Sequence, residues 1–210
     1  MIIIHHRINS VRDLKRVQDT NGIEVDVRYH ENELILEHDP YEHHNKKNTS
    51  LKDLLVRWNN SGPIILNLKS EGIEDECIKI MEEYGINNWF FLDMSMPILV
   101  RYSDLAHKRI PRRFSPNNLA VRFSDREPIE YALAFKDKVK WVWVDYFDDF
   151  PLNKKTFLSL KSASFKICLV SPELQNKSCL NHIELAKICS DFDIDAICTK
   201  KPEFWHNINC

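Results

Sequence analysis

Glycine is scarce in this chain, which has 4 glycines among 210 residues. Loops that cradle a nucleotide phosphate use several closely spaced glycines, and no G-x-G-x-x-G segment occurs in the sequence. A dinucleotide-binding loop and any other glycine-rich phosphate loop are therefore excluded.

Long apolar runs and paired cysteines are also missing. No run approaches the roughly 18 apolar residues of a membrane span. The start, MIIIHHR, lacks the basic region and long apolar stretch of a secretory signal. None of the six cysteines forms a C-x-x-C pair, and Cys168 and Cys198 lie inside apolar, strand-like segments. These features favour a cytoplasmic protein with reduced thiols and no membrane span.

Neither sign of charge is in excess, because the formal net charge is -2. This balance gives no electrostatic basis for binding nucleic acid or an anionic membrane. The segment HHNKK at 43–47 could form a metal or phosphate patch, but without periodicity it is more typical of a polar loop. No segment indicates an oligomer interface.

Short apolar segments instead alternate with amphipathic ones along the whole chain. Helix-like segments begin at the N-cap residues Ser10 and Ser50, and another ends at Gly85. Strands alternating with helices predict βαβ units and a parallel sheet, and eight units predict a closed (β/α)8 TIM barrel; an open doubly wound sheet is the competing architecture. No linker divides the chain, so residues 1–210 are expected to form one compact domain. The strand-like segments are 2–5, 23–27, 64–69, 89–94, 119–123, 141–147, 165–170 and 195–200.

Two carboxylates interrupt the apolar pattern of the second strand, IEVDV. Because side chains alternate along a strand, Glu24 and Asp26 are expected to point together toward the barrel axis. In the next strand, IILNLK, Asn67 and Lys69 point inward near its end. Buried carboxylates need a compensating cation, and oxygen ligands suit Mg²⁺ or Ca²⁺. The alternative is a half-solvated strand whose acids face water.

Histidines follow two other apolar segments. His6 and Arg7 follow the first strand, and His38 ends ELILEH, the returning arm of a short hairpin after the second strand. Active sites of (β/α)8 enzymes lie at the carboxyl ends of the strands, so all these polar groups are expected at one rim. Such a set can bind a metal, hold an anion and transfer protons.

Two later strands carry further inward candidates. Arg122 in LAVRF could bind a second anionic group or pair with a neighbouring acid. Trp143 in WVWVDYF could stack on a polyol or sugar, although tryptophans in a small barrel more often fill its interior.

In order, IIIHHR, IEVDV, HDP, ILNLK and DAICTKKP resemble the pattern of the glycerophosphodiester phosphodiesterase family. That pattern is His-Arg-Gly, Glu-x-Asp, His-Asp, Glu-x-Lys and a last strand ending near Thr-Asp-x-Pro. The resemblance implies a (β/α)8 barrel that cleaves a small phosphodiester with the help of a divalent metal. The substrate would be a glycerophosphodiester from lipid turnover or a phosphodiester of a surface-polymer precursor.

The resemblance also implies roles for individual residues. A substrate hydroxyl beside the phosphate would attack phosphorus, and the alcohol would leave. His6 and His38 would be the general acid and base, without a choice between them. The metal ligands would be Glu24, Asp26 and Asn67, and the residues holding the phosphate would be Arg7 and Lys69.

Three positions depart from the family pattern. Ile8 replaces the glycine after His-Arg, Asn67 replaces the glutamate that would be the third metal ligand, and Lys200 stands where an acid is usual. An amide oxygen can ligate Mg²⁺ or Ca²⁺ but lacks the charge, so metal affinity should fall. Two alternatives therefore stay open. One is a weakened or inactive relative that binds a phosphorylated ligand, and the other is a metal-dependent aldolase or sugar isomerase.

Overall fold

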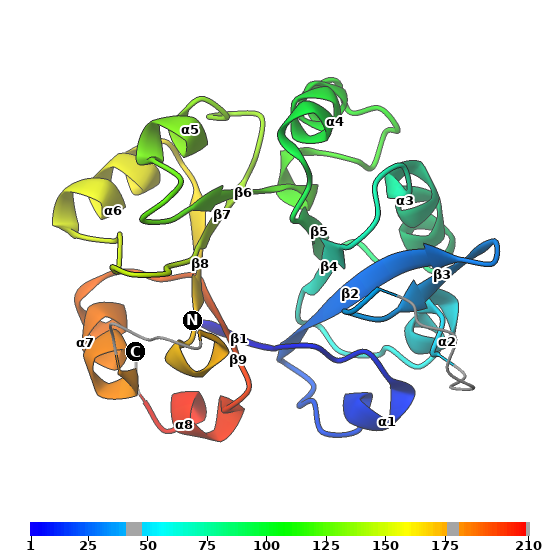
Figure 1. The fold of residues 1–210 in the computed structure, drawn as a ribbon, viewed down its shortest axis with the longest axis horizontal. Coiled ribbons are helices and arrows are strands. Elements are labelled where there is room, and N and C mark those ends of the chain that lie inside the picture. The colour runs from blue at the N-terminus through cyan, green and yellow to red at the C-terminus, as the bar shows by residue number, and fades with distance from the viewer. Residues whose placement is uncertain (41–47, 176–180, 209–210) are drawn as a thin grey trace.

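Eight parallel strands form the wall of a barrel in the computed structural model, which describes residues 1–40, 48–175 and 181–208 (Figure 1). The order around the wall is β5-β4-β2-β1-β9-β8-β7-β6, and an isolated parallel bridge between Phe91 and Leu119 spans the seam between β5 and β6. The strands are β1 (Ile2–His5), β2 (Gly22–His30), β3 (Glu33–Leu36), β4 (Ile64–Leu68), β5 (Trp89–Leu92), β6 (Ala120–Phe123), β7 (Trp141–Val144), β8 (Lys166–Val170) and β9 (Ala196–Thr199). The prediction of a (β/α)8 TIM barrel is confirmed.

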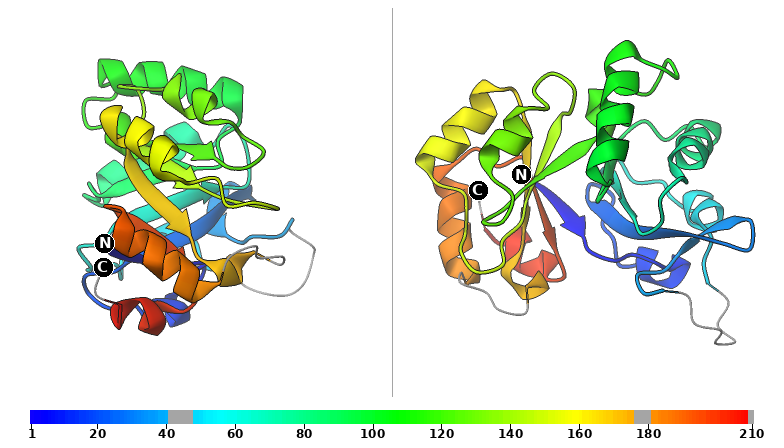
Figure 2. Two further views of the ribbon diagram at one scale, coloured as in Figure 1. Left: turned by 90° about the vertical axis from the view of Figure 1, so that its left-hand side faces the viewer. Right: turned by 45° about the horizontal axis from the view of Figure 1, so that its top comes forward.

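Helices connect successive strands and lie outside the barrel wall (Figures 1 and 2). In the part of the chain that is described, no helix is long and apolar enough to cross a membrane. The helices are α1 (Val11–Leu14), α2 (Leu51–Leu55), α3 (Glu74–Glu83), α4 (Met96–Lys108), α5 (Ile129–Leu133), α6 (Lys154–Ser162), α7 (His182–Asp191) and α8 (Pro202–His206), with the 3-10 turns η1 (Pro116–Asn118) and η2 (Pro172–Leu174).

The predicted helix ends have the expected local chemistry. The Ser10 hydroxyl accepts the N–H of Asp13 at 3.1 Å, and the Ser50 hydroxyl accepts the N–H of Asp53 at 3.1 Å, so each satisfies a free donor in a first helical turn. Gly85 follows α3 with φ of 68°, a left-handed conformation that glycine adopts at little cost.

Two apolar layers hold the barrel together. The larger layer lies between strands and helices and includes Ile23, Val25 and Val27 of β2. The smaller layer fills the barrel interior, where the rings of Phe90 and Trp141 stack with centroids 4.8 Å apart. This alternation leaves the side chains at positions 24 and 26 on the inner face of β2.

The predicted hairpin is present. β3 pairs antiparallel with β2, from Val27 opposite Leu36 to His30 opposite Glu33. The two turn residues, 31 and 32, both have positive φ, as a two-residue turn of type I′ requires. The hairpin extends outward from the barrel wall (Figures 1 and 2).

Four cysteines lie in the described ranges, and all four are buried free thiols: Cys77, Cys168, Cys189 and Cys198. Burial raises the pKa of the Cys168 thiol above its ordinary value, so it stays protonated. Cys179, Cys210 and the HHNKK segment at 43–47 lie outside the described residues.

Candidate active site

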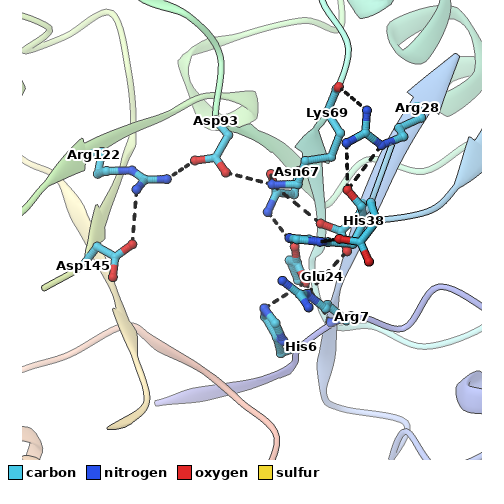
Figure 3. A network of polar contacts seen from close by, with 12 residues as sticks. His6, Arg7, Glu24, Arg28, His38, Asn67, Lys69, Asp93, Arg122 and Asp145 are labelled. Carbon is cyan, nitrogen blue, oxygen red and sulfur yellow. Dashed lines mark hydrogen bonds and ion pairs between the residues drawn. The ribbon is translucent and has the colours of Figure 1, made fainter. Parts of the chain in front are cut away.

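The polar residues predicted for the barrel mouth lie together at the carboxyl ends of β1, β2 and β4 (Figure 3). Glu24 and Asp26 are both fully buried on the inner face of β2. In the parallel register Asp26 stands opposite Asn67, which brings β4 alongside the carboxylates. The orientation inferred from strand alternation therefore holds at these positions.

Glu24 accepts a hydrogen bond on each carboxylate oxygen. Its Oε2 accepts the backbone N–H of Arg7 at 2.8 Å, and its Oε1 accepts the Nδ2 of Asn67 at 2.8 Å. The Nε2 of His6 lies 3.8 Å from Oε2. Burial, and then the nearby charge of Asp26, raise the pKa of Glu24 to about 7. This carboxyl is thus poised to gain or lose a proton near neutral pH.

Asp26 has one satisfied oxygen and one that no hydrogen bond reaches. Its Oδ2 accepts the Nδ2 of Asn9 at 2.8 Å, and its own backbone N–H donates to the Oδ1 of Asn9 at 2.9 Å. Its Oδ1 is buried without a hydrogen-bond donor. Two cations lie nearby, since the Nζ of Lys69 is 3.7 Å from Oδ1 and the Nε of Arg7 is 3.8 Å from Oδ2.

Lys69 begins a chain of alternating charges across the mouth (Figure 3). Its Nζ donates to the Oδ1 of Asn67 at 2.7 Å and to the Oδ2 of Asp93 at 3.1 Å. Asp93 also pairs with Arg122, which in turn lies 3.3 Å from the Oδ2 of Asp145. Burial opposes ionisation of Asp93, but Arg122 and Lys69 together hold its pKa below the ordinary value.

Arg122 is therefore engaged by acids, which is the second of the two roles expected for it. Its Nε also lies 3.7 Å from the Oε2 of Glu127. Trp143, expected either to stack on a ligand or to fill the interior, belongs to the apolar layer inside the barrel and is 5% exposed. Ile8, at the position of the family glycine, is 4% exposed and packs in the layer outside the strands.

The two histidines sit in different surroundings. His6 is largely buried, and its Nδ1 has no hydrogen-bond partner. Burial, and then the positive charges of Arg7 and Lys200, lower the pKa of His6 to about 3, so its imidazole is neutral at physiological pH. The side chain of His38 is 36% exposed, and its Nδ1 lies 2.7 Å from the Oδ1 of Asp39.

Arg28, which was not among the residues predicted for the site, holds the hairpin arm against the barrel mouth. Its guanidinium donates to the backbone oxygen of His38 at 2.8 Å and to that of Lys69 at 3.0 Å. It follows Glu24 and Asp26 at the same spacing along β2, so strand alternation was a signal that could have revealed it.

Backbone strain is concentrated at this mouth. Arg7 and Asp93 both have left-handed backbones, with φ of 55° and 62°. For a residue other than glycine this conformation costs about 1 kcal/mol. At Arg7 it accompanies the contact of the backbone N–H with Glu24, and the side chain meanwhile lies near Asp26. Strain of this kind is typical of functional sites.

The donor set at the mouth fits an oxygen-liganded divalent cation. Within the described ranges, no three His, Cys, Asp or Glu side chains gather as metal ligands. The mouth instead offers two buried carboxylates and the amide of Asn67, and the unsatisfied Oδ1 of Asp26 and the raised pKa of Glu24 both indicate room for more positive charge. Lys69 supplies part of this positive charge, and its ammonium binds the amide oxygen of Asn67.

Comparison with known proteins identifies the fold. No family model matches the chain, and no curated protein matches its sequence. The structure is similar to a solved (β/α)8 barrel, that of glycerophosphodiester phosphodiesterase from Agrobacterium tumefaciens str. C58. The TM-score is 0.68 at 12% sequence identity, over 98% of this chain and 99% of that chain. The chain therefore has a fold like that of glycerophosphodiester phosphodiesterases.

Proposed function

We propose that this barrel cleaves a phosphodiester of the glycerophosphodiester kind. The observation that carries the proposal is the meeting of two histidines, two buried carboxylates and two cations at one barrel mouth. The similarity to a barrel solved as a glycerophosphodiester phosphodiesterase supports it. The residues are His6, His38, Glu24, Asp26, Arg7 and Lys69.

Arg7 and Lys69 are the groups we assign to the phosphate. Each lies within 4 Å of Asp26, one just after β1 and one just after β4, so the two cations flank the buried carboxylates. Fixed positive charges at this place favour the additional negative charge of a pentacoordinate phosphorus over that of the bound diester. Asp93 holds the Lys69 ammonium at 3.1 Å and keeps it oriented toward the mouth.

The surroundings of the histidines divide their roles. Burial lowers the pKa of His6 to about 3, so its imidazole is neutral and can accept a proton, and we assign it as the base for the attacking hydroxyl. His38 is partly exposed, and its Nδ1 lies 2.7 Å from the Oδ1 of Asp39, a contact that orients the imidazole. We assign His38 as the acid that donates a proton to the leaving alcohol.

The covalent step balances without another reactant. The oxygen of a substrate hydroxyl forms a bond to phosphorus while the bond from phosphorus to the leaving alcohol breaks. His6 takes the hydroxyl proton, and His38 supplies a proton to the departing oxygen. The products are a cyclic phosphodiester and a free alcohol, and water then opens the ring to a monoester.

A divalent cation, Mg²⁺ or Ca²⁺, would be held by Glu24, Asp26 and the amide oxygen of Asn67. Such an ion would supply charge stabilisation at a non-bridging phosphate oxygen. Asn67 would have to turn its oxygen away from Lys69, which now donates to it at 2.7 Å. Without a third carboxylate the affinity for the ion should be modest.

A binding role without turnover is the second candidate, and the bonds of Asn67 favour it. Its amide donates to Glu24 and accepts from Lys69, so a neutral side chain bridges the two charges. A mouth compensated in this way can hold a phosphorylated ligand even if no metal binds.

Phosphorus NMR of the purified protein with a mixture of glycerophosphodiesters tests the proposal. We expect a cyclic diester or monoester signal with Mg²⁺ or Ca²⁺ and its loss with chelator. His6→Ala and His38→Ala should each lower the rate by about 100-fold to 10,000-fold, because each removes a proton-transfer group. His107→Ala, on the exposed last turn of α4, is the matched control and should retain the rate. Binding of the diesters without conversion under any metal would favour the second candidate.

A further inference from the structure

A cavity of about 340 Å³ lies beside the two residues that end the first strand, His6 and Arg7. It lies between the β1 end, the segment after α1, and the β9–α8 connection. Its lining combines backbone turns with several charged side chains. The lining residues are His5, His6, Arg7, Ile8, Arg16, Thr199, Lys200, Pro202 and Glu203. The reaction proposed above uses only the part of this space at His6 and Arg7.

Lys200 is held beside His6 by the pairing of β1 with β9. His5 stands opposite Thr199 in the register, and the backbone N–H of His6 donates to the oxygen of Thr199 at 2.9 Å. Glu173 then fixes the turn, since its Oε1 accepts the Thr199 hydroxyl at 2.6 Å and the backbone N–H of Lys200 at 2.7 Å. The backbone of Lys200 is thus fixed, and its exposed side chain lines the cavity.

The ammonium of Lys200 differs from the other two cations of this cavity in having no direct ion pair within the described part of the chain. Arg16 pairs with Asp13, and Arg7 lies 3.8 Å from Asp26. Lys200 has no ion-pair partner among the residues that the structure describes. The lining also includes the carboxylate of Glu203, which forms no ion pair with the Lys200 ammonium.

We infer that this cavity binds a second anionic group of the substrate, a phosphate or a carboxylate, through Lys200. The inference rests on the proposed phosphodiester cleavage. Because Lys200 and Arg7 line the same cavity, a diester seated at Arg7 and His6 would extend one of its alcohol groups toward Lys200. An alcohol with its own negative charge would find an unpaired ammonium there, whereas a neutral alcohol would leave that ammonium to water. Lys200 is accordingly a specificity residue, not a catalytic one.

Two diesters that differ by one carboxylate provide the test: glycerophosphoethanolamine and glycerophosphoserine. For the unmodified protein we expect the kcat/KM of the serine diester to exceed that of the ethanolamine diester by about twofold to fivefold, the usual value of one ion pair at an exposed side chain. Lys200→Met should reduce this ratio to about one. Lys201→Met, at the next exposed position but outside the cavity lining, is the matched control and should keep the ratio.

An equilibrium measurement separates this inference from the proposed reaction. Calorimetry compares the binding of glycerol 2-phosphate with that of glycerol 1,3-bisphosphate and does not depend on cleavage of any diester. The unmodified protein should bind the bisphosphate more tightly, and Lys200→Met should remove this preference. The bisphosphate also tests a phosphate, in place of the carboxylate, as the second anionic group. Cleavage with the same substrate ratio in the unmodified and Lys200→Met proteins would overturn the inference and leave the reaction standing. If nothing is cleaved, the reaction fails, and equal bisphosphate affinity in both proteins would overturn the inference as well.

Discussion

The buried carboxyl of Glu24 should make the stability of the fold fall as the pH rises through the acidic range. Glu24 is fully buried, and its pKa is raised from 4.5 to about 7, first by burial and then by Asp26. Between these two values the unfolded chain has released the proton while the folded chain retains it. The free energy of unfolding therefore decreases with pH across that interval and is level above it.

The size of the effect follows from the displacement of the pKa. Each tenfold change in an acid constant corresponds to about 1.4 kcal/mol, so the full interval from 4.5 to about 7 corresponds to about 3 kcal/mol. Most of this stability, about 2 to 3 kcal/mol, is lost as the pH rises from about 5 to about 8. His6 acts in the opposite direction, because its lowered pKa removes stability as the pH falls below its ordinary value.

Glu24→Gln isolates the contribution of the carboxyl. Glutamine keeps the shape and cannot ionise, although its amide cannot accept both the N–H of Arg7 and the Nδ2 of Asn67. That lost bond costs a similar amount at both pH values, and His6 is common to both proteins. The two proteins differ in their free energy of unfolding, and the pH dependence of that difference therefore reports the ionisation of Glu24.

Urea denaturation with chelator present, at about pH 5 and about pH 8, measures this change. From about pH 5 to about pH 8, the free energy of unfolding of Glu24→Gln should rise by about 2 to 3 kcal/mol relative to that of the unmodified protein. Mg²⁺ at the higher pH should restore stability to the unmodified protein and much less to the variant, because the ion replaces the missing positive charge. Parallel pH profiles for the two proteins would refute the reasoning about the buried carboxyl.

Two further substitutions test the surroundings of this carboxyl. Asn67→Glu should lower the melting temperature in chelator by adding buried charge, yet tighten Mg²⁺ binding roughly tenfold in a thermal-shift titration; unchanged affinity would remove Asn67 from the ligand set. Asp93→Asn should cost about 2 kcal/mol in urea denaturation, because Lys69 and Arg122 each lose one of their partners. Asp148→Asn, at an exposed ion pair, is its control and should cost less than about 1 kcal/mol, so equal costs would show that the network at the mouth adds nothing.

The barrel could be predicted from the sequence because the apolar pattern of the strands and the residues at the helix ends indicate the same element boundaries. All eight predicted wall strands are present within about three residues at their ends, since apolar alternation decides which segments enter the sheet. The capping hydroxyls of Ser10 and Ser50 and the left-handed Gly85 mark helix boundaries through local chemistry alone. What the sequence could not provide was the near-closure of the seam by the isolated bridge from Phe91 to Leu119, because that depends on the whole wall.

For the site, the alternation of side chains along each strand predicted which way the side chains point, but not which residues they contact. It placed Glu24 and Asp26 inward, yet it could not show that Asn9 binds Asp26 or that Asp93 lies between two cations. Those contacts join strands and loops far apart in the chain, and although aspartate adopts a left-handed backbone more readily than most residues, its residue type alone does not show that Asp93 does so. The pKa of about 3 at His6 likewise results from burial by the assembled barrel.

Two departures from the phosphodiesterase pattern act on a single quantity, the charge of the barrel mouth. Asparagine in place of glutamate at position 67 removes one negative charge, and lysine in place of an acid at position 200 changes the charge by two units in the same direction. A mouth that is more positive holds a divalent cation less tightly and an anionic substrate more tightly. Weak metal affinity and a preference for a substrate with two anionic groups should therefore occur together. Asn67→Glu is accordingly expected to strengthen metal binding and to reduce the preference for the serine diester in the same protein.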